Sequence, residues 1–350
     1  MPVLVRGCSG AGARVRRTAP GCCDPGPVSS HEPDQPPVEV VSAALAVVNA
    51  SAGSARTPAA RDALAVLEAS LPPGGLEVAR TGGPDDLRRA LAGLDGRRLV
   101  VLGGDGSVHA AISALHSLGG LERVRGVGPI GLVPLGTGND LARSLGLQVG
   151  AASLAARTAV EGRPSPVELV VSLDEHGRED GVVVNAVHAG IGVSASKRAK
   201  TAKRALRALA YPAGALAAGV AARPWHLRVV VDGEVVHDGS SGVLLVAVNL
   251  GSTVGGGARL SPLATPHDGL VDVVVSGATG PLARAGFAAA MVRGQHVERR
   301  DTATVRGADV VVEAVDGRAF EVNADGDLSQ ARTRWRWRCA GDAWQVLVPR

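Results

Sequence analysis

The 350-residue sequence contains few aromatic side chains: four tryptophans, two phenylalanines and one tyrosine make up 2% of the chain. Its hydrophobic core must therefore be built mainly from valine, leucine and alanine. Proteins that bind single-stranded nucleic acids stack bases on aromatic side chains, and the basic residues of this sequence are dispersed rather than gathered in one patch. The composition therefore argues against nucleic acid as a partner.

Cysteine is also scarce, and its four residues show neither the spacing of a zinc site nor that of a disulfide framework: Cys8, Cys22, Cys23 and Cys339. No run of 18 or more apolar residues is present, so we expect no membrane-spanning helix. The N-terminal segment contains arginines but no continuous apolar stretch, so we expect no signal peptide. These absences predict a cytoplasmic protein.

Chain length and local composition predict a tail followed by two domains. Residues 1–38 are rich in proline, glycine, serine and arginine without hydrophobic periodicity, which is typical of a disordered tail. Residues 39–166 alternate strand-like and helix-like segments, which predicts a nucleotide-binding α/β domain with a doubly wound parallel sheet. Residues 167–350 contain many valine-rich strands separated by turns, which predicts a mostly antiparallel β-sandwich, and we expect this half to bind the substrate.

Two helical segments interrupt the β-rich half. One is an insert at residues 196–222, basic at its start and apolar later, and the other is expected at residues 281–295. The predicted fold class is therefore α/β plus β.

Two glycine-rich turns, GGDGS at residues 103–107 and GTGND at residues 136–140, each follow a predicted strand and precede a helix. Backbone N–H groups at a helix N-terminus bind anions, and glycine lets a phosphate group approach the backbone closely. In a doubly wound sheet both turns lie at the carboxyl edge, where ligands bind. The pair predicts a nucleoside triphosphate site, although a tight turn that needs positive φ explains either turn alone.

Each turn also contains an acid, Asp105 in the first and Asp140 in the second. A carboxylate repels a phosphate group unless Mg²⁺ lies between them, or unless the carboxylate binds a hydroxyl group or loop amides instead. We therefore predict that ATP and Mg²⁺ bind here, and both explanations of the acids stay open.

These motifs resemble the catalytic domain of diacylglycerol kinases, and more closely the soluble bacterial lipid kinases related to sphingosine and ceramide kinases. The resemblance runs from about residue 42 to residue 349. It implies transfer of a phosphoryl group from ATP to the hydroxyl group of diacylglycerol or a related lipid alcohol. The nucleotide-binding residues that it implies are Asn49, Gly53, Arg56, Thr81, Gly103, Gly104, Asp105, Gly106, Ser107, Gly136, Thr137, Gly138, Asn139 and Asp140.

The segment VNADGDLS resembles the part of these kinases that supplies catalytic carboxylates. The resemblance implies that Asp325 or Asp327 is the base, and Asp105 completes the predicted catalytic set. A second acidic string, DGE at residues 232–234, follows a strand-like segment, and we interpret it as a hairpin turn.

The segment TPHDGL resembles the metal loop of the bacterial relatives. It implies a structural Mg²⁺ held by the side chain of Asp268 and by the carbonyl groups of Thr265 and Leu270. An ordinary Asp-Gly β-turn fits these residues equally well.

The implied partner is a lipid substrate at a membrane surface. The basic residues between Lys197 and Arg207 suit anionic headgroups at the inner membrane face, and the solvated side of an ordinary packed helix is the alternative. We expect no stable protein partner, and a homodimer stays open. His109, His116 and His188 form no recognisable constellation, and we expect packing or surface roles for them.

Two other functions compete with the lipid kinase. An NAD kinase-like or other small-molecule kinase would share the first glycine turn and the two-domain plan. A nucleotide sensor without activity would retain both turns.

Overall fold

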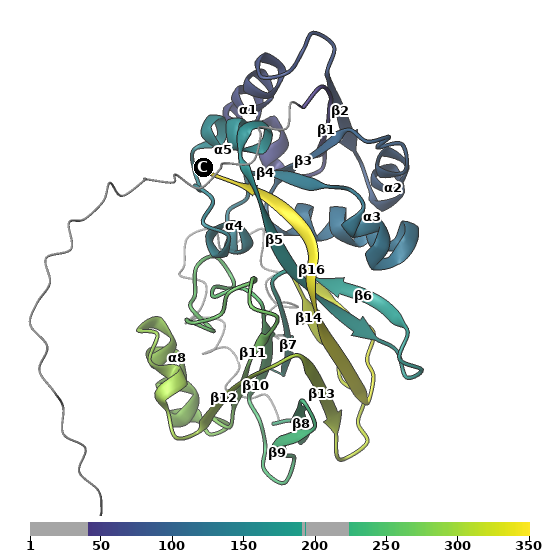
Figure 1. The fold of residues 1–350 in the computed structure, drawn as a ribbon. Coiled ribbons are helices and arrows are strands. Elements are labelled where there is room, and N and C mark those ends of the chain that lie inside the picture. The colour runs from purple at the N-terminus through teal and green to yellow at the C-terminus, as the bar shows by residue number, and fades with distance from the viewer. Residues whose placement is uncertain (1–40, 191–192, 194–223) are drawn as a thin grey trace, which may run out of the picture. The chain divides into compact units, whose positions relative to one another are not determined.

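The computed structural model describes residues 41–190, 193 and 224–350 (Figure 1). The predicted tail at 1–38 and the predicted helical insert at 196–222 lie outside the described residues. Within the described residues, none of the helices has both the length and the apolar composition that crossing a membrane requires.

The first half of the chain forms a parallel sheet with the strand order β2-β1-β3-β4. Its strands are β1 (Ala44–Asn49), β2 (Leu76–Thr81), β3 (Arg98–Gly103) and β4 (Pro129–Pro134). The helices around it are η1 (Gly53–Arg56), α1 (Pro58–Ala69), α2 (Pro84–Ala92), α3 (Asp105–Arg125), α4 (Asp140–Ser144) and α5 (Ala152–Glu161). The order reverses between β1 and β3, which makes the carboxyl ends of these two strands the expected place for a ligand.

Helices cover both faces of this sheet, which explains why β1, β3 and β4 are mostly apolar and buried, whereas the edge strand β2 is more polar. Leu45 and Val47 of β1 pack with α2 and α3, whereas Ala44, Ala46 and Val48 pack with α1 and α5. Alternate side chains of one strand therefore enter two separate cores.

The sequence pattern does not predict α5, because its buried face consists mainly of alanines, with Thr158 and Val160, rather than of large apolar side chains. A Cβ atom on Gly131 of β4 would lie 2.5 Å from the Cβ atom of Ala159. The helix is therefore fixed by a close approach to the sheet that leaves little hydrophobic signal in the sequence.

The second half of the chain is a sandwich of antiparallel strands whose core is formed by valines from both layers. One layer is a six-stranded sheet in the order β12-β11-β10-β7-β14-β15, and the other contains β5, β6, β8, β9, β13 and β16. The elements are β5 (Arg163–Leu173), β6 (Glu179–Val183), β7 (Ala186–Gly190), β8 (Leu227–Val231), β9 (Glu234–Asp238), β10 (Leu245–Asn249), β11 (Val271–Ser276), α8 (Pro281–Val292), η2 (His296–Glu298), β12 (Thr302–Gly307), β13 (Asp309–Ala314), β14 (Val322–Ala324), β15 (Asp327–Leu328) and β16 (Arg334–Val348). The predicted fold class is confirmed.

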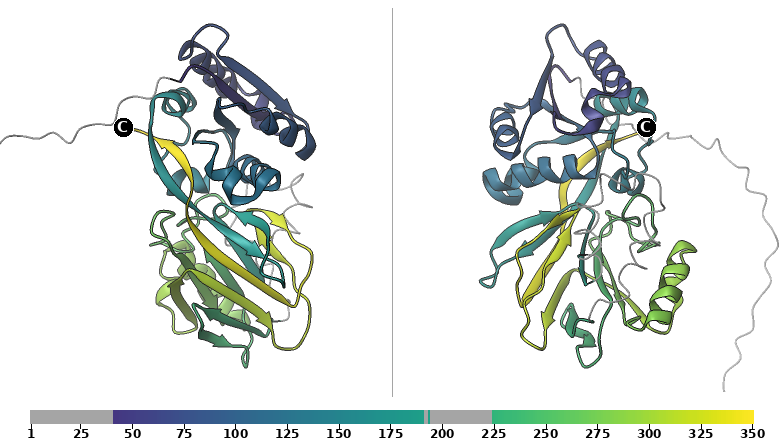
Figure 2. Two further views of the ribbon diagram at one scale, coloured as in Figure 1. Left: turned by 45° about the vertical axis from the view of Figure 1, so that its right-hand side comes forward. Right: turned by 180° about the vertical axis from the view of Figure 1, so that it is seen from behind.

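The last strand, β16, joins the two halves. Gln345 and Val346 pair in parallel with Pro129 and Ile130 of β4, while earlier residues of β16 pair with β5 and β13 in antiparallel fashion. Figure 2 shows β16, in yellow, running from the antiparallel strands into the parallel sheet. Because β5 itself crosses residue 166, the domain boundary at that residue stays a prediction.

Candidate active site

A cavity of about 510 Å³ opens at the carboxyl ends of β1 and β2, beside the first turns of α3. Its volume falls within the range usual for small-ligand sites. Asn49 follows β1, Thr81 ends β2, and Ser107 and His109 come from α3. Asp327 of β15 also lines the cavity, so the β-rich half contributes a side chain to it.

Four of the predicted site residues therefore share one cavity: Asn49, Thr81, Ser107 and Asp327. Gly53 and Arg56 lie in η1, and neither is among the residues that line the cavity. Arg56 and Thr137 are exposed. The role implied for Gly53, Arg56 and Thr137 stays a prediction.

The two glycine turns lie side by side, as expected from the sheet, but they pack against each other. A Cβ atom on Gly104 would lie 2.9 Å from the Cα atom of Gly136, and one on Gly136 would lie 2.6 Å from the Cα atom of Gly104. A Cβ atom on Gly103 would overlap the side chain of Ser107. None of the glycines in the two turns has a positive φ. Close packing, rather than left-handed backbone, explains Gly103, Gly104 and Gly136.

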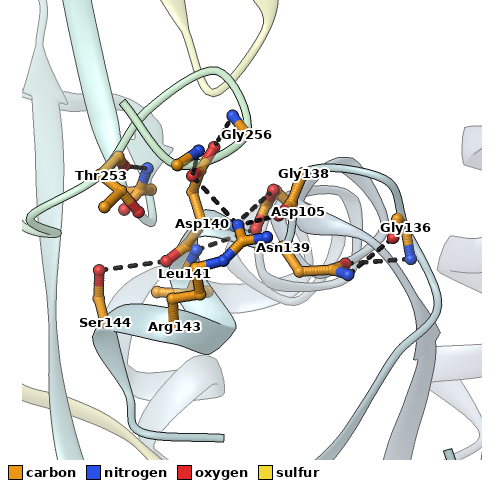
Figure 3. A network of polar contacts seen from close by, with 12 residues as sticks. Asp105, Gly136, Gly138, Asn139, Asp140, Leu141, Arg143, Ser144, Thr253 and Gly256 are labelled. Carbon is orange, nitrogen blue, oxygen red and sulfur yellow. Dashed lines mark hydrogen bonds and ion pairs between the residues drawn. The ribbon is translucent and has the colours of Figure 1, made fainter. Parts of the chain in front are cut away.

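The two acids of the turns bind backbone amides (Figure 3). Asp105 accepts hydrogen bonds from the N–H groups of Asp140 and Leu141, both at 3.0 Å, and so caps the start of α4. Asp140 accepts hydrogen bonds from the N–H groups of Gly256 and Gly257, both at 2.7 Å. The first acid thus connects the two turns, and the second connects them to a loop of the β-rich half.

Gly256 and Gly257 have φ values of 92° and 111°, a conformation that glycine adopts at little cost. This backbone geometry directs two successive N–H groups to one carboxylate. It explains the GGG string at residues 255–257.

Asn139 has a structural role in its own turn. It is 2% exposed and left-handed, with φ of 54°. Its side chain accepts a hydrogen bond from the N–H group of Gly136 at 3.0 Å and donates one to the Gly136 carbonyl group at 2.7 Å (Figure 3).

Burial raises the pKa of Asp105, and the two backbone hydrogen bonds that its carboxylate accepts only partly oppose that effect.

Asp325 lies in a tight turn between β14 and β15, behind the cavity wall. Its carboxylate is 1% exposed and accepts hydrogen bonds from the N–H groups of Val184, Asn185 and Ala186 at 2.7–3.0 Å. It also lies 2.8 Å from Nδ1 of His109. The residues that line the cavity include Asp327 but not Asp325.

The prediction of a packing or surface role for His109 missed its place in the cavity wall. Burial lowers the pKa of His109, but the hydrogen bond to Asp325 and the nearby negative charges outweigh it, so the pKa is raised overall. The available signal was the position of His109 four residues after Asp105, one helical turn along α3.

Comparison with known proteins identifies the family to which this architecture belongs. Residues 43–172 match the diacylglycerol kinase catalytic domain, and residues 185–348 match the YegS C-terminal NAD kinase beta sandwich-like domain. The chain is 30% identical over 264 residues to a diacylglycerol kinase of Mycobacterium tuberculosis, covering 73% of this chain and 80% of the relative. The chain belongs to the diacylglycerol kinase family.

Two further proteins are similar to this family member, one in sequence and one in structure. A diacylglycerol kinase of Bacillus subtilis is 24% identical over 234 residues, covering 65% of this chain and 70% of the relative. The crystal structure of a diacylglycerol kinase from Bacillus anthracis has a TM-score of 0.65 at 20% identity, covering 87% of this chain and 96% of that chain. This last likeness concerns the fold alone.

In this diacylglycerol kinase family member, protein contacts hold the loop that is predicted to bind a metal. Asp268 accepts a hydrogen bond from the N–H group of Leu270 at 3.2 Å and pairs with the guanidinium group of Arg306. Among the described residues there is no cluster of three or more histidine, cysteine or acidic side chains that could hold a metal ion. A cation at Asp268 would share its carboxylate with Arg306 and with the N–H group of Leu270. The site of Asp268, Thr265 and Leu270 therefore stays a prediction, and no step below depends on it.

Proposed function

We propose that this chain is an ATP-dependent lipid kinase that phosphorylates the hydroxyl group of diacylglycerol or a related lipid alcohol. The observation that carries the proposal is the cavity at the carboxyl edge of the parallel sheet, lined by polar residues from both halves of a diacylglycerol kinase family member. The match of residues 43–172 to the catalytic domain favours this function over an NAD kinase-like activity.

The N-terminal turn of α3 supports binding of the phosphate groups of ATP. The first N–H groups of a helix have no acceptor within the helix, and the helix dipole adds positive potential there. A Cβ atom on Gly106 would meet no atom within 4 Å, so the backbone is approachable at this residue. Asn49, Thr81 and Ser107 add polar groups to the cavity beside this turn.

Mg²⁺ would enter with ATP as part of the substrate and would offset charge on the phosphate oxygens. The carboxylates of Asp105 and Asp140 are engaged by backbone amides, so we assign them the positioning of the two glycine turns. Asp327 is the acid of the predicted set that lines the cavity and is exposed.

A lipid acceptor requires contact with a membrane surface. The basic residues that suit such contact belong to the predicted insert at 196–222, outside the described residues. Peripheral membrane contact, and the open question of a homodimer, stay predictions.

The proposal is tested by incubating the purified chain with γ-labelled ATP and a total lipid extract. Label in a lipid product supports it, whereas label transfer to NAD alone, or ATP binding without transfer, contradicts it. Gly106→Ala places a methyl group where the phosphates would approach in the proposed complex, and we expect the KM for ATP to rise about tenfold without loss of stability. Gly280→Ala, at the start of α8 and also in open space, is the matched control.

A further inference from the structure

His109 contacts a buried acid on one side and a hydroxyl group on the other. Its Nδ1 atom lies 2.8 Å from Oδ2 of Asp325, and its Nε2 atom lies 3.3 Å from Oγ of Ser113. Both His109 and Ser113 line the cavity of about 510 Å³. The imidazole ring is therefore part of the surface that a bound substrate would touch.

The contact with Asp325 fixes which ring nitrogen carries hydrogen. An ionised carboxylate only accepts hydrogen bonds, so Nδ1 of His109 must be the donor. In the neutral ring, Nε2 then has a lone pair that can accept a proton. This is the division of roles found when an acid orients a catalytic histidine.

The acid itself is poorly placed to act directly. Three backbone N–H groups and His109 surround the carboxylate of Asp325, which is 1% exposed. Held in this way, Asp325 cannot rotate toward a substrate without leaving buried N–H groups unpaired. Its geometry suits it to hold His109 in one orientation.

We propose that His109 is the general base for the acceptor hydroxyl group and that Asp325 is its positioning residue. This inference rests on the proposed lipid kinase function. The hydroxyl proton moves to Nε2 of His109 as the acceptor oxygen forms a bond to the γ-phosphorus of ATP. The bond between that phosphorus and the β,γ-bridging oxygen breaks, and ADP leaves with the electron pair. His109 then releases its proton to water.

The charges around His109 suit this role. Asp325 and Asp327 face the ring from the β14–β15 turn and from β15, and together they raise its pKa against the opposing effect of burial. On α3 itself, Asp105 lies one turn earlier. A general base works best when its pKa is near the operating pH, and two neighbouring acids also stabilise the imidazolium ion that forms.

His116 provides a matched control on the same helix. Its Nε2 atom lies 2.8 Å from Oε2 of Glu179, and its side chain is 12% exposed compared with 13% for His109. It is not among the residues that line the cavity. His109→Asn and His116→Asn therefore remove equally buried, carboxylate-paired rings from one helix, with only the first at the proposed site.

The experiment measures lipid phosphorylation by the full chain against pH, together with thermal melting. The asparagine amide can still donate to Asp325 but cannot take a proton. We expect the kcat of the wild type to rise with pH as His109 loses its proton. We expect His109→Asn to lower kcat at least 100-fold, to leave the KM for ATP within about twofold, and to abolish that rise. His116→Asn should keep the wild-type kcat and pH profile.

Recovery of activity in His109→Gly on addition of imidazole would support the proposal independently of the asparagine variant. An unchanged kcat and pH profile in a folded His109→Asn variant would overturn it, as would a wild-type rate that falls as His109 loses its proton. Loss of the pH dependence in Asp327→Asn but not in His109→Asn would assign the base to Asp327 instead. A wild-type chain that phosphorylates no lipid would overturn the proposed function itself.

Discussion

Two Asp-Gly turns in the β-rich half share one local structure but have different surroundings. Asp232 and Gly233 connect β8 to β9 with φ values of 49° and 88°, and Asp325 and Gly326 connect β14 to β15 with φ values of 49° and 99°. Positive φ at both central residues is typical of a two-residue type I′ hairpin. In both turns the aspartate also accepts hydrogen bonds from consecutive N–H groups of another segment.

What differs is the environment of the carboxylate. Asp232 is exposed and binds the N–H groups of Ala308 and Asp309 at the edge of the sandwich. Asp325 is buried against residues 184–186 and contacts His109, which lines the cavity. One local motif thus serves as a strand connector in one place and as a support for the candidate active site in the other.

The largest expected difference between the turns follows from deleting each carboxylate. Asp325→Ala leaves three buried N–H groups and His109 without their acceptor, so we expect a loss of about 3–5 kcal/mol of unfolding free energy and at least 100-fold in kcat. Asp232→Ala should cost about 1 kcal/mol and leave kcat unchanged. Urea denaturation and the lipid kinase assay check both variants, and equal effects at the two turns would contradict the comparison.

A smaller effect is expected at Asp327, two residues after Asp325. Because Asp327 is exposed at the cavity, Asp327→Asn should change the unfolding free energy by less than about 0.5 kcal/mol. Loss of its charge near His109 should still lower kcat about tenfold, since that charge favours the protonated ring. Loss of stability without loss of rate in this variant would show that Asp327 belongs to the hairpin alone.

The smallest expected effect is the pH dependence of stability at His109. Its pKa in the folded chain is raised above the ordinary value of 6.5, so protonation favours the folded state. The pair with Asp325 therefore contributes its full stability below about pH 6.5, and that contribution is lost as pH rises through the raised pKa. The Tm difference between wild type and His109→Asn should be larger at about pH 6 than at about pH 9. A difference that grows with pH would contradict the assigned charge state.

The glycine turns show how far the sequence could lead. Their adjacency was predictable, because the carboxyl ends of neighbouring parallel strands meet at one edge. The contact between Gly104 and Gly136 was not predictable, because a glycine in the sequence is equally consistent with close approach of a ligand, a positive φ or a backbone contact. The same limit applies to Asp105, whose amide partners on α4 come from 35 and 36 residues further along the chain.

The sequence by itself determined the local features of this protein. Buried strand runs, helix starts, glycine turns and Asp-Gly hairpins each depend on residues a few positions apart, and they sufficed for the fold class and for the resemblance that the family match confirmed. Only the tertiary structure decided which acid meets which partner. Asp325 and His109 are 216 residues apart, and a side chain of either type gives no local sign of so distant a contact. That contact exists because β14 pairs with β7 and so brings its turn against α3, a result of packing that no short stretch of sequence specifies.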